Sequence, residues 1–132
     1  MAILDDIGGY INTNTSFTLG TDFFLSLLPD TPDNCVALFE SGGVAPQYTQ
    51  GSTGTPVIER PELQVITRHT SYETGRANAN TVYLLLTAIT NATINSNLYY
   101  RIEAAATPAM FQRDDSRRVL FTTNFNVMRD TP

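Results

Sequence analysis

The chain has no lysine, one cysteine and one histidine among its 132 residues. Because Cys35 stands alone, an internal disulfide is excluded, and its apolar neighbours predict a buried strand residue rather than a reactive thiol. Cys35 and His69 together do not supply the four ligands of a usual zinc site. Glycine-rich phosphate-binding motifs are also missing. We therefore expect no metal and no cofactor.

Residues suited to catalysis are scarce as well. Two adjacent acidic pairs occur, Asp5–Asp6 and Asp114–Asp115. Neighbours in a helix or a strand point in different directions, so their spacing makes neither pair a catalytic dyad. We therefore expect that the protein is not an enzyme. A small hydrolase is the alternative, with His69 as its best candidate for a general base.

The chain contains few cations, and all eight of them are arginine. The formal net charge of −5 works against nonspecific DNA binding, because affinity for phosphate depends on clustered cations. Arginine suits bidentate pairing with carboxylates across protein contacts better than lysine does, although compositional drift is the simpler explanation. Long apolar runs and a basic N-terminal region are absent, so we expect a soluble chain without a recognisable secretion signal or a membrane partner.

The length suits one domain, residues 1–132, with a single core. Apolar residues at helical spacing predict helices over residues 2–13 and about 72–90, with Ser71 as the N-cap of the second. Strand patterns predict extended segments at residues 17–28 (one strand or two), 35–40, 62–68, 98–105 and 119–129. The predicted fold is α+β: a mostly antiparallel sheet of about four to six strands with two helices packed on one face.

Alternation within the last two predicted strands indicates which side chains face the core. In the earlier strand, Ile102 is predicted inside and Tyr99 outside. In the final strand, Phe125 is predicted inside and Arg129 on the opposite face.

Residues 41–56 contain four glycines and two prolines without periodicity. They predict a long flexible loop, and Pro56 and Pro61 bracket a short turn before the next strand. Loops of this length inside compact domains are often functional, although an inert surface loop fits the composition equally well. Tyr48, the one aromatic residue of the loop, and its neighbour Gln47 are candidate contact residues.

The link before the last strand, residues 107–118, is the most charged stretch of the chain. Its charged side chains are Arg113, Asp114, Asp115, Arg117 and Arg118. The acidic pair among the arginines opposes contact with nucleic acid. We therefore expect a protein contact, with a solvated turn as the alternative.

Residues 56–68 (Pro-Val-Ile-Glu-Arg-Pro-Glu-Leu-Gln-Val-Ile-Thr-Arg), followed by residues 71–77 (Ser-Tyr-Glu-Thr-Gly-Arg-Ala), resemble the minor capsid and tail terminator proteins of long-tailed bacteriophages. The resemblance continues at residues 28–29, 32–33, 36–40, 100–103, 108, 113–114 and 121–127. It covers most of residues 25–129 and depends on several spaced motifs rather than on any one of them.

The resemblance implies a single tail-terminator-like domain that forms a ring, a homo-hexamer. The ring is expected to cap the tail tube and to join the tail to the head connector, in the virion tail or neck and in the host cytoplasm during assembly. Implied partners are other copies, the tail tube protein and head-closure or connector proteins, and DNA is expected to pass the lumen without specific binding. A head-closure or other neck protein is the alternative, and a free-standing binding domain is a further one.

Two contact surfaces are expected from this resemblance. Tyr48, with Gln47 beside it, is expected to make an axial contact that orders on assembly. Salt bridges to a neighbouring subunit or a connector ring are expected from Arg113, Asp114, Asp115, Arg117 and Arg118.

Overall fold

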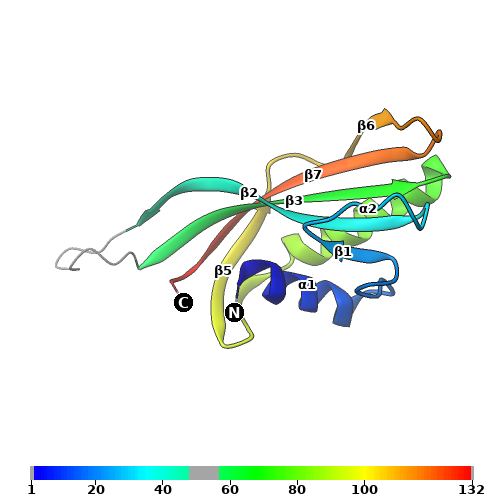
Figure 1. Ribbon diagram of the computed structural model, residues 1–132. Helices are drawn as coiled ribbons and strands as arrows, with labels where there is room; N and C mark the ends of the chain where they lie inside the picture. Colours follow the sequence, from blue (N-terminus) through cyan, green and yellow to red (C-terminus); the bar gives the residue numbers. More distant parts are fainter. Residues whose placement is uncertain (1, 48–56, 132) are drawn as a thin grey trace.

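The structure is a computed structural model that describes residues 2–47 and 57–131. Within these ranges the chain forms two helices and one curled sheet of seven strands (Figure 1). The elements are α1 (Ile3–Asn14), β1 (Phe23–Leu25), β2 (Cys35–Gln47), β3 (Ile58–His69), α2 (Tyr72–Thr87), β4 (Thr90–Ile94), β5 (Asn97–Ala104), β6 (Ala109–Arg113) and β7 (Val119–Asp130). The predicted α+β class and both helices are confirmed.

The sheet runs in the order β1-β2-β3-β7-β5-β4, and β6 pairs with β7. It is mixed, because β1 pairs with β2 in parallel whereas the other neighbours are antiparallel. With seven strands, the sheet is also larger than the predicted four to six. β4 follows closely on α2 and β6 lies in the charged link, and neither five-residue strand shows a clear period of two. The predicted segment at residues 17–28 contributes only the three residues of β1.

β2 and β3 extend past the helices, with the end of β7 paired to β3 (Figure 1). We call residues 42–47 of β2 and 58–61 of β3 the arm. The flexible loop predicted over residues 41–56 is wrong for its first part, which is strand up to Gln47, and the turn predicted at Pro61 is also wrong. The strands of the arm pair through Val44 with Arg60 and through Gln47 with Ile58.

Glycine and proline fit into the arm because its pairing contains two irregularities, between Glu40 and Gly43 and between Val44 and Gln47. Gly43 has a φ of 147°, and a Cβ at this position would lie 2.3 Å from the carbonyl oxygen of Arg60. Only glycine permits this close approach of the two strands. The residues that predict a loop therefore mark a bulged strand.

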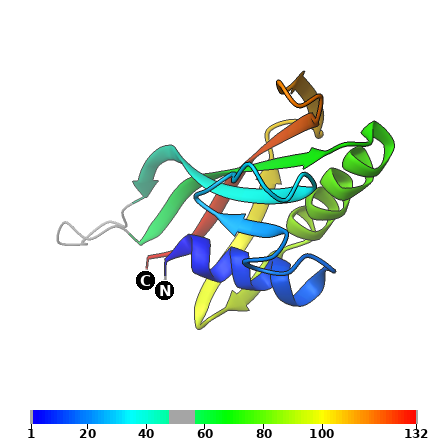
Figure 2. The same cartoon turned by 45° about the vertical axis from the view of Figure 1, so that its right-hand side comes forward.

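One hydrophobic cluster contains side chains from both helices and from the sheet. The helices contribute Ile3, Ile7 and Ile11 of α1 and Val82, Leu86 and, just after α2, Ile89. The sheet contributes Phe23, Val36, Leu38, Leu63, Val65, Ile94, Tyr99, Ile102, Phe125 and Val127. The beginning of α1 and the end of β7 lie side by side near the base of the arm (Figure 2).

α2 begins at its predicted N-cap, where Ser71 Oγ accepts the backbone N–H of Thr74 at 3.4 Å. Gly75 lies against the sheet, because a Cβ there would be 2.8 Å from Phe121 and 3.0 Å from His69. Of the helices in the described ranges, none is long and apolar enough to cross a membrane.

A bulge in β5 changes which of its side chains are buried. The register with β7 shifts between Tyr99 and Arg101, so Tyr99 and Ile102 are both buried in the core. The prediction that Tyr99 faces solvent is therefore wrong. Arg129 also lies on the buried face of β7, 7% exposed, and not on the opposite face as predicted.

Replacing Gly75 tests how closely α2 packs on the sheet. Gly75→Val should lower the free energy of unfolding by about 1–3 kcal/mol, because the added methyl groups push against Phe121. Urea unfolding followed by circular dichroism measures this. Ala77→Val, at an exposed position of α2, is the matched control and should change the same quantity by less than about 1 kcal/mol. Equal losses in both variants would contradict the close packing.

Candidate functional site

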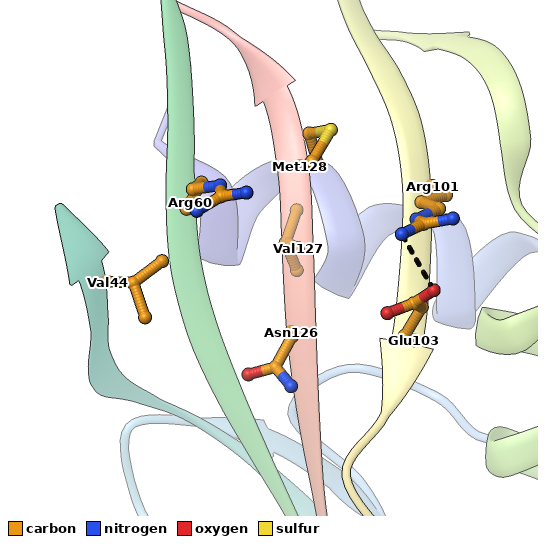
Figure 3. Close-up of a pocket in the computed structure, with 7 residues that line it drawn as sticks. All are labelled: Val44, Arg60, Arg101, Glu103, Asn126, Val127 and Met128. Carbon is orange, nitrogen blue, oxygen red and sulfur yellow. Dashed lines mark ion pairs between the residues drawn. The ribbon is translucent and has the colours of Figure 1, made fainter. Parts of the chain in front are cut away.

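A groove of about 220 Å³ lies across the sheet near the base of the arm (Figure 3). It lies on the face whose side chains alternate with those of the hydrophobic cluster. Its lining residues come from β2, β3, β5 and β7: Val44, Arg60, Arg101, Glu103, Asn126, Val127 and Met128.

Two arginines flank Met128 in one row across the strands, which we call the basic row. Val44 of β2 pairs with Arg60 of β3. The β3–β7 register places Arg60 opposite Met128, and Met128 pairs with Arg101 on its other side. Arg60 forms no ion pair with any residue in the described ranges.

An acidic row lies next to the basic row, two residues along each strand. Asn126 pairs with Glu62 on one side and with Glu103 on the other. Glu103 forms an ion pair with Arg101 at 3.0 Å, and both side chains are more than half exposed, so the pair adds little stability. The groove therefore presents Arg60, Arg101 and Glu103, and Glu62 of the acidic row lies beside it.

A buried polar network holds the β3 strand of the arm. Arg129 donates through Nε to Glu59 Oε2 and through Nη1 to the hydroxyl of Tyr99, each at 3.1 Å. Tyr99 donates to Asp6 Oδ2 at 2.6 Å, and Asp6 is fully buried in α1. These contacts join the arm strand β3 to β7, β5 and α1.

The carboxylate of Asp6 has further partners in this network. The side-chain amides of Asn95 and Asn97 donate to its two oxygens at 3.1 and 2.8 Å, and Arg129 Nη1 lies 3.6 Å from Oδ2. Burial and the hydrogen bond to Asp6 raise the pKa of Tyr99, so its hydroxyl keeps the proton that it donates. A satisfied buried network of this kind is rigid.

Residues 113–118 form a turn that Arg118 closes. Arg118 is 6% exposed and contacts Asp114 Oδ2 at 2.7 Å and Asp30 Oδ1 at 2.9 Å. Asp114 Oδ1 also accepts the backbone N–H groups of Ser116 and Arg118. Burial alone would raise the pKa of Asp114, but these hydrogen bonds and the Arg118 charge lower it. Asp114 and Arg118 therefore hold the turn together.

The other three charged residues of the turn, Arg113, Asp115 and Arg117, lie at the surface. Arg113 Nη1 donates to the backbone carbonyl of Arg117 at 3.2 Å. Asp115 forms no ion pair with any residue that the structure describes. The turn therefore presents an acidic side chain between two basic ones.

A second buried arginine fixes the loop beside this turn. Arg68, 3% exposed, donates through Nε to the carbonyl of Asp33 at 3.0 Å and through Nη2 to the carbonyl of Pro32 at 2.7 Å. Arg118 binds the same loop through the carboxylates of Asp30 and Asp33. The loop and the turn thus form one fixed end of the molecule.

The arm and the charged turn lie at opposite ends of the β3–β7 ladder (Figure 1). Ile58 pairs with Asp130 at the arm, and His69 pairs with Val119 at the turn. Each strand has 12 residues. At strand spacing, this separates the two ends by roughly 35 Å.

The predicted contact residues are therefore not one patch. The structure brings together the five charged residues of the turn, of which Asp114 and Arg118 are engaged inside the chain. Gln47 is exposed at the far end of the arm, and Tyr48 lies outside the described residues. The interface role of all seven stays a prediction.

Cys35 and His69, the residues considered for catalysis, line one small pocket with Asp22. Burial lowers the pKa of His69, whose Nδ1 accepts the backbone N–H of Ser71 at 2.9 Å. Burial raises the pKa of the Cys35 thiol, which disfavours the reactive thiolate. In the described ranges, no three His, Cys, Asp or Glu side chains are grouped to hold a metal ion.

Comparison with known proteins identifies the family. Residues 10–131 match the model of a family described as bacteriophage tail terminator protein. The chain belongs to the bacteriophage tail terminator family. The match confirms the resemblance found in the sequence.

The fold of this tail terminator also occurs in a solved structure, the virion of a native gene transfer agent particle. A chain of that particle is 14% identical, with a TM-score of 0.68, and the alignment covers 98% of this chain and 96% of that chain. No curated protein matches this sequence.

Sequence patterns do not reveal which residues hold the two ends of this tail terminator in place. Burial of two of these residues is indicated only by their position in the pattern. Arg129 continues the alternating series of buried residues in β7, and Asp6 adjoins the apolar side of α1. A buried charge requires a partner. The sequence around Arg118 does not indicate that it is buried, because the loop near Asp30 that covers it is distant in sequence.

Removing the central arginine of the arm network should destabilise the protein. Arg129→Met should lower the free energy of unfolding by about 3 kcal/mol or more, because Asp6 then remains buried without a cation. Urea unfolding measures this. Arg101→Met, which breaks an exposed ion pair, is the control and should cost about 1 kcal/mol or less. A similar loss in the two variants would contradict the importance of the network.

Acid should weaken the charged turn through Asp114. The pKa of this carboxyl is lowered by folding, so its contribution to stability is complete above the unfolded value of about 4 and is lost as the pH falls through the folded value. The difference in unfolding free energy between wild type and Asp114→Asn should therefore shrink between about pH 5 and pH 2. Asp115→Asn is the control, and thermal unfolding across this pH range is the measurement. A difference that does not change with pH would count against this role of Asp114.

Proposed function

We propose that this tail terminator is a virion tail structural protein whose copies form a closed ring on the finished tail tube. The family match over residues 10–131 is the observation that carries the proposal. A ring bound to the last ring of the tube blocks further addition of tube subunits, and its other side joins the head connector. Its place is the tail or neck of the virion, after assembly in the host cytoplasm.

The two fixed ends of the molecule support ring formation. A cyclic ring uses the same heterologous contact in every subunit, so each subunit needs two different complementary surfaces. The arm and the charged turn are two such surfaces at opposite ends of one ladder. The hexameric number comes from the resemblance to tail terminators, whereas the single domain over residues 1–132 is also expected from the length of the chain.

The arrangement of the helices leaves one sheet face for contacts. Both helices contribute to a single hydrophobic cluster. We infer that they cover the same face of the sheet, because side chains of a strand alternate between its two faces. The opposite face, with the basic and acidic rows, is then free to meet other protein surfaces.

The candidate contact residues divide between two kinds of partner. Gln47, at the far end of the arm, and Tyr48, the next residue in the sequence, are proposed to contact the tail tube along the ring axis. The charged turn is proposed to contact a neighbouring copy or the head-closure protein, with Arg113, Asp115 and Arg117 as the contacting side chains. Asp114 and Arg118 act by holding the shape of the turn. Acidic residues on both surfaces favour passage of DNA through the lumen without specific binding.

Imaging tests the proposed function. Negative-stain images of the purified protein with tail tubes should show rings at one end of each tube, and particles assembled without the protein should carry overlong tails. Full heads without tails would instead indicate a head-closure protein. A protein that stays monomeric and does not bind tubes would contradict the proposal.

A further inference from the structure

The groove beside the arm has the chemistry to bind the charged turn of another copy. We propose that the groove, together with Glu62 beside it, receives residues 113–117 of the neighbouring subunit, a contact that rests on the ring proposed above. The proposal gives the charged turn a specific binding surface on the neighbouring copy.

The groove offers two kinds of charge at fixed positions. Arg60 and Arg101 lie on either side of Met128, two strand spacings or roughly 10 Å apart. Glu62 and Glu103 flank Asn126 in the next row. An acidic side chain therefore finds Arg60, which has no ion pair in the described ranges, and Arg101, whose exposed pair with Glu103 is weak; basic side chains find the two carboxylates of the next row.

The charges of the turn are complementary to those of the groove. Arg113, Asp115 and Arg117 are all exposed, and Asp115 lies between the two arginines in the sequence. Asp115 suits the space between the two arginines of the basic row, and its flanking arginines suit the acidic row. The methyl groups of Val44 and the side chain of Met128 provide apolar surface for the arginine stems.

Both surfaces are shaped before they meet. The internal contacts of Asp114 and Arg118 fix the turn, and the ion pair of Glu59 with Arg129 fixes the strand that carries Arg60. Fixed surfaces lose less conformational entropy on binding than flexible ones do.

The contact must be intermolecular. The turn adjoins Val119 and the groove surrounds Met128, at opposite ends of β7. A chain therefore cannot fill its own groove, and each copy offers one groove and one turn. Such a head-to-tail contact repeats from copy to copy and closes into a ring when the rotation permits. Nucleic acid is a poor occupant, because the acidic row repels phosphates.

Charge reversal tests the contact. Arg60→Glu and Asp115→Arg should each weaken self-association by about tenfold or more, because each places like charges against each other. The double variant should recover most of the loss. Glu73→Arg is the matched control for Asp115→Arg: it makes the same charge change at an exposed position of α2 and should leave association unchanged. Sedimentation velocity over a range of protein concentrations measures this, or ring counts on tail tubes if rings form only there.

A mixture of the two single variants provides the sharper test. In a head-to-tail contact, the groove of the Arg60→Glu variant meets the turn of the Asp115→Arg variant with opposite charges, and the remaining contact keeps the wild-type pair. An equal mixture should therefore associate although neither variant does alone. Single variants that associate like wild type, or a mixture and a double variant that both fail to recover, would overturn this contact and leave the ring proposal standing. Wild-type protein that stays monomeric with and without tubes would overturn both.

Discussion

The pairing of β3 with β7 is the constraint on which the rest of the structure depends. It places Glu59 opposite Arg129 at the arm and His69 opposite Val119 at the turn. Because side chains alternate along both strands, one face of the ladder carries the hydrophobic cluster and the other carries the two charged rows. A slip of one residue would expose the cluster and bury the charges, so the same register determines stability and the proposed contact surface.

Burial explains part of the exclusive use of arginine. Arg68, Arg118 and Arg129 are buried, and each donates to several oxygens that come from segments distant in sequence. A planar guanidinium has five N–H donors and suits this geometry, whereas a lysine ammonium is a single strongly hydrated point charge. Nothing in the structure explains why the exposed cations, such as Arg113 and Arg117, are arginine as well.

The sequence predicts this fold where one periodicity runs without interruption. Both helices and the core side of β7 follow from apolar spacing, and Ser71 marks the start of α2. Prediction fails at bulges, because an extra residue changes the alternation, and the glycines and prolines that accompany a bulge in the arm also predict a loop. The bulge after Tyr99 and the one at Gly43 are the two cases. The charged turn is visible in the sequence, but its division into internal and exposed charges depends on a loop near Asp30 that only the fold brings close.

The buried arginines bear on how the weak surface charges of the proposed contact could close the proposed ring. An exposed ion pair contributes about 1 kcal/mol or less, so one contact between a groove and a turn holds two copies only weakly. In a closed ring every subunit makes two such contacts, and no subunit leaves without breaking both. A flexible turn or arm would lose conformational entropy at each contact and cancel this gain. In the proposed ring, Arg118 and Arg129, which are buried inside each chain, would therefore support assembly by keeping both surfaces in shape before a partner binds.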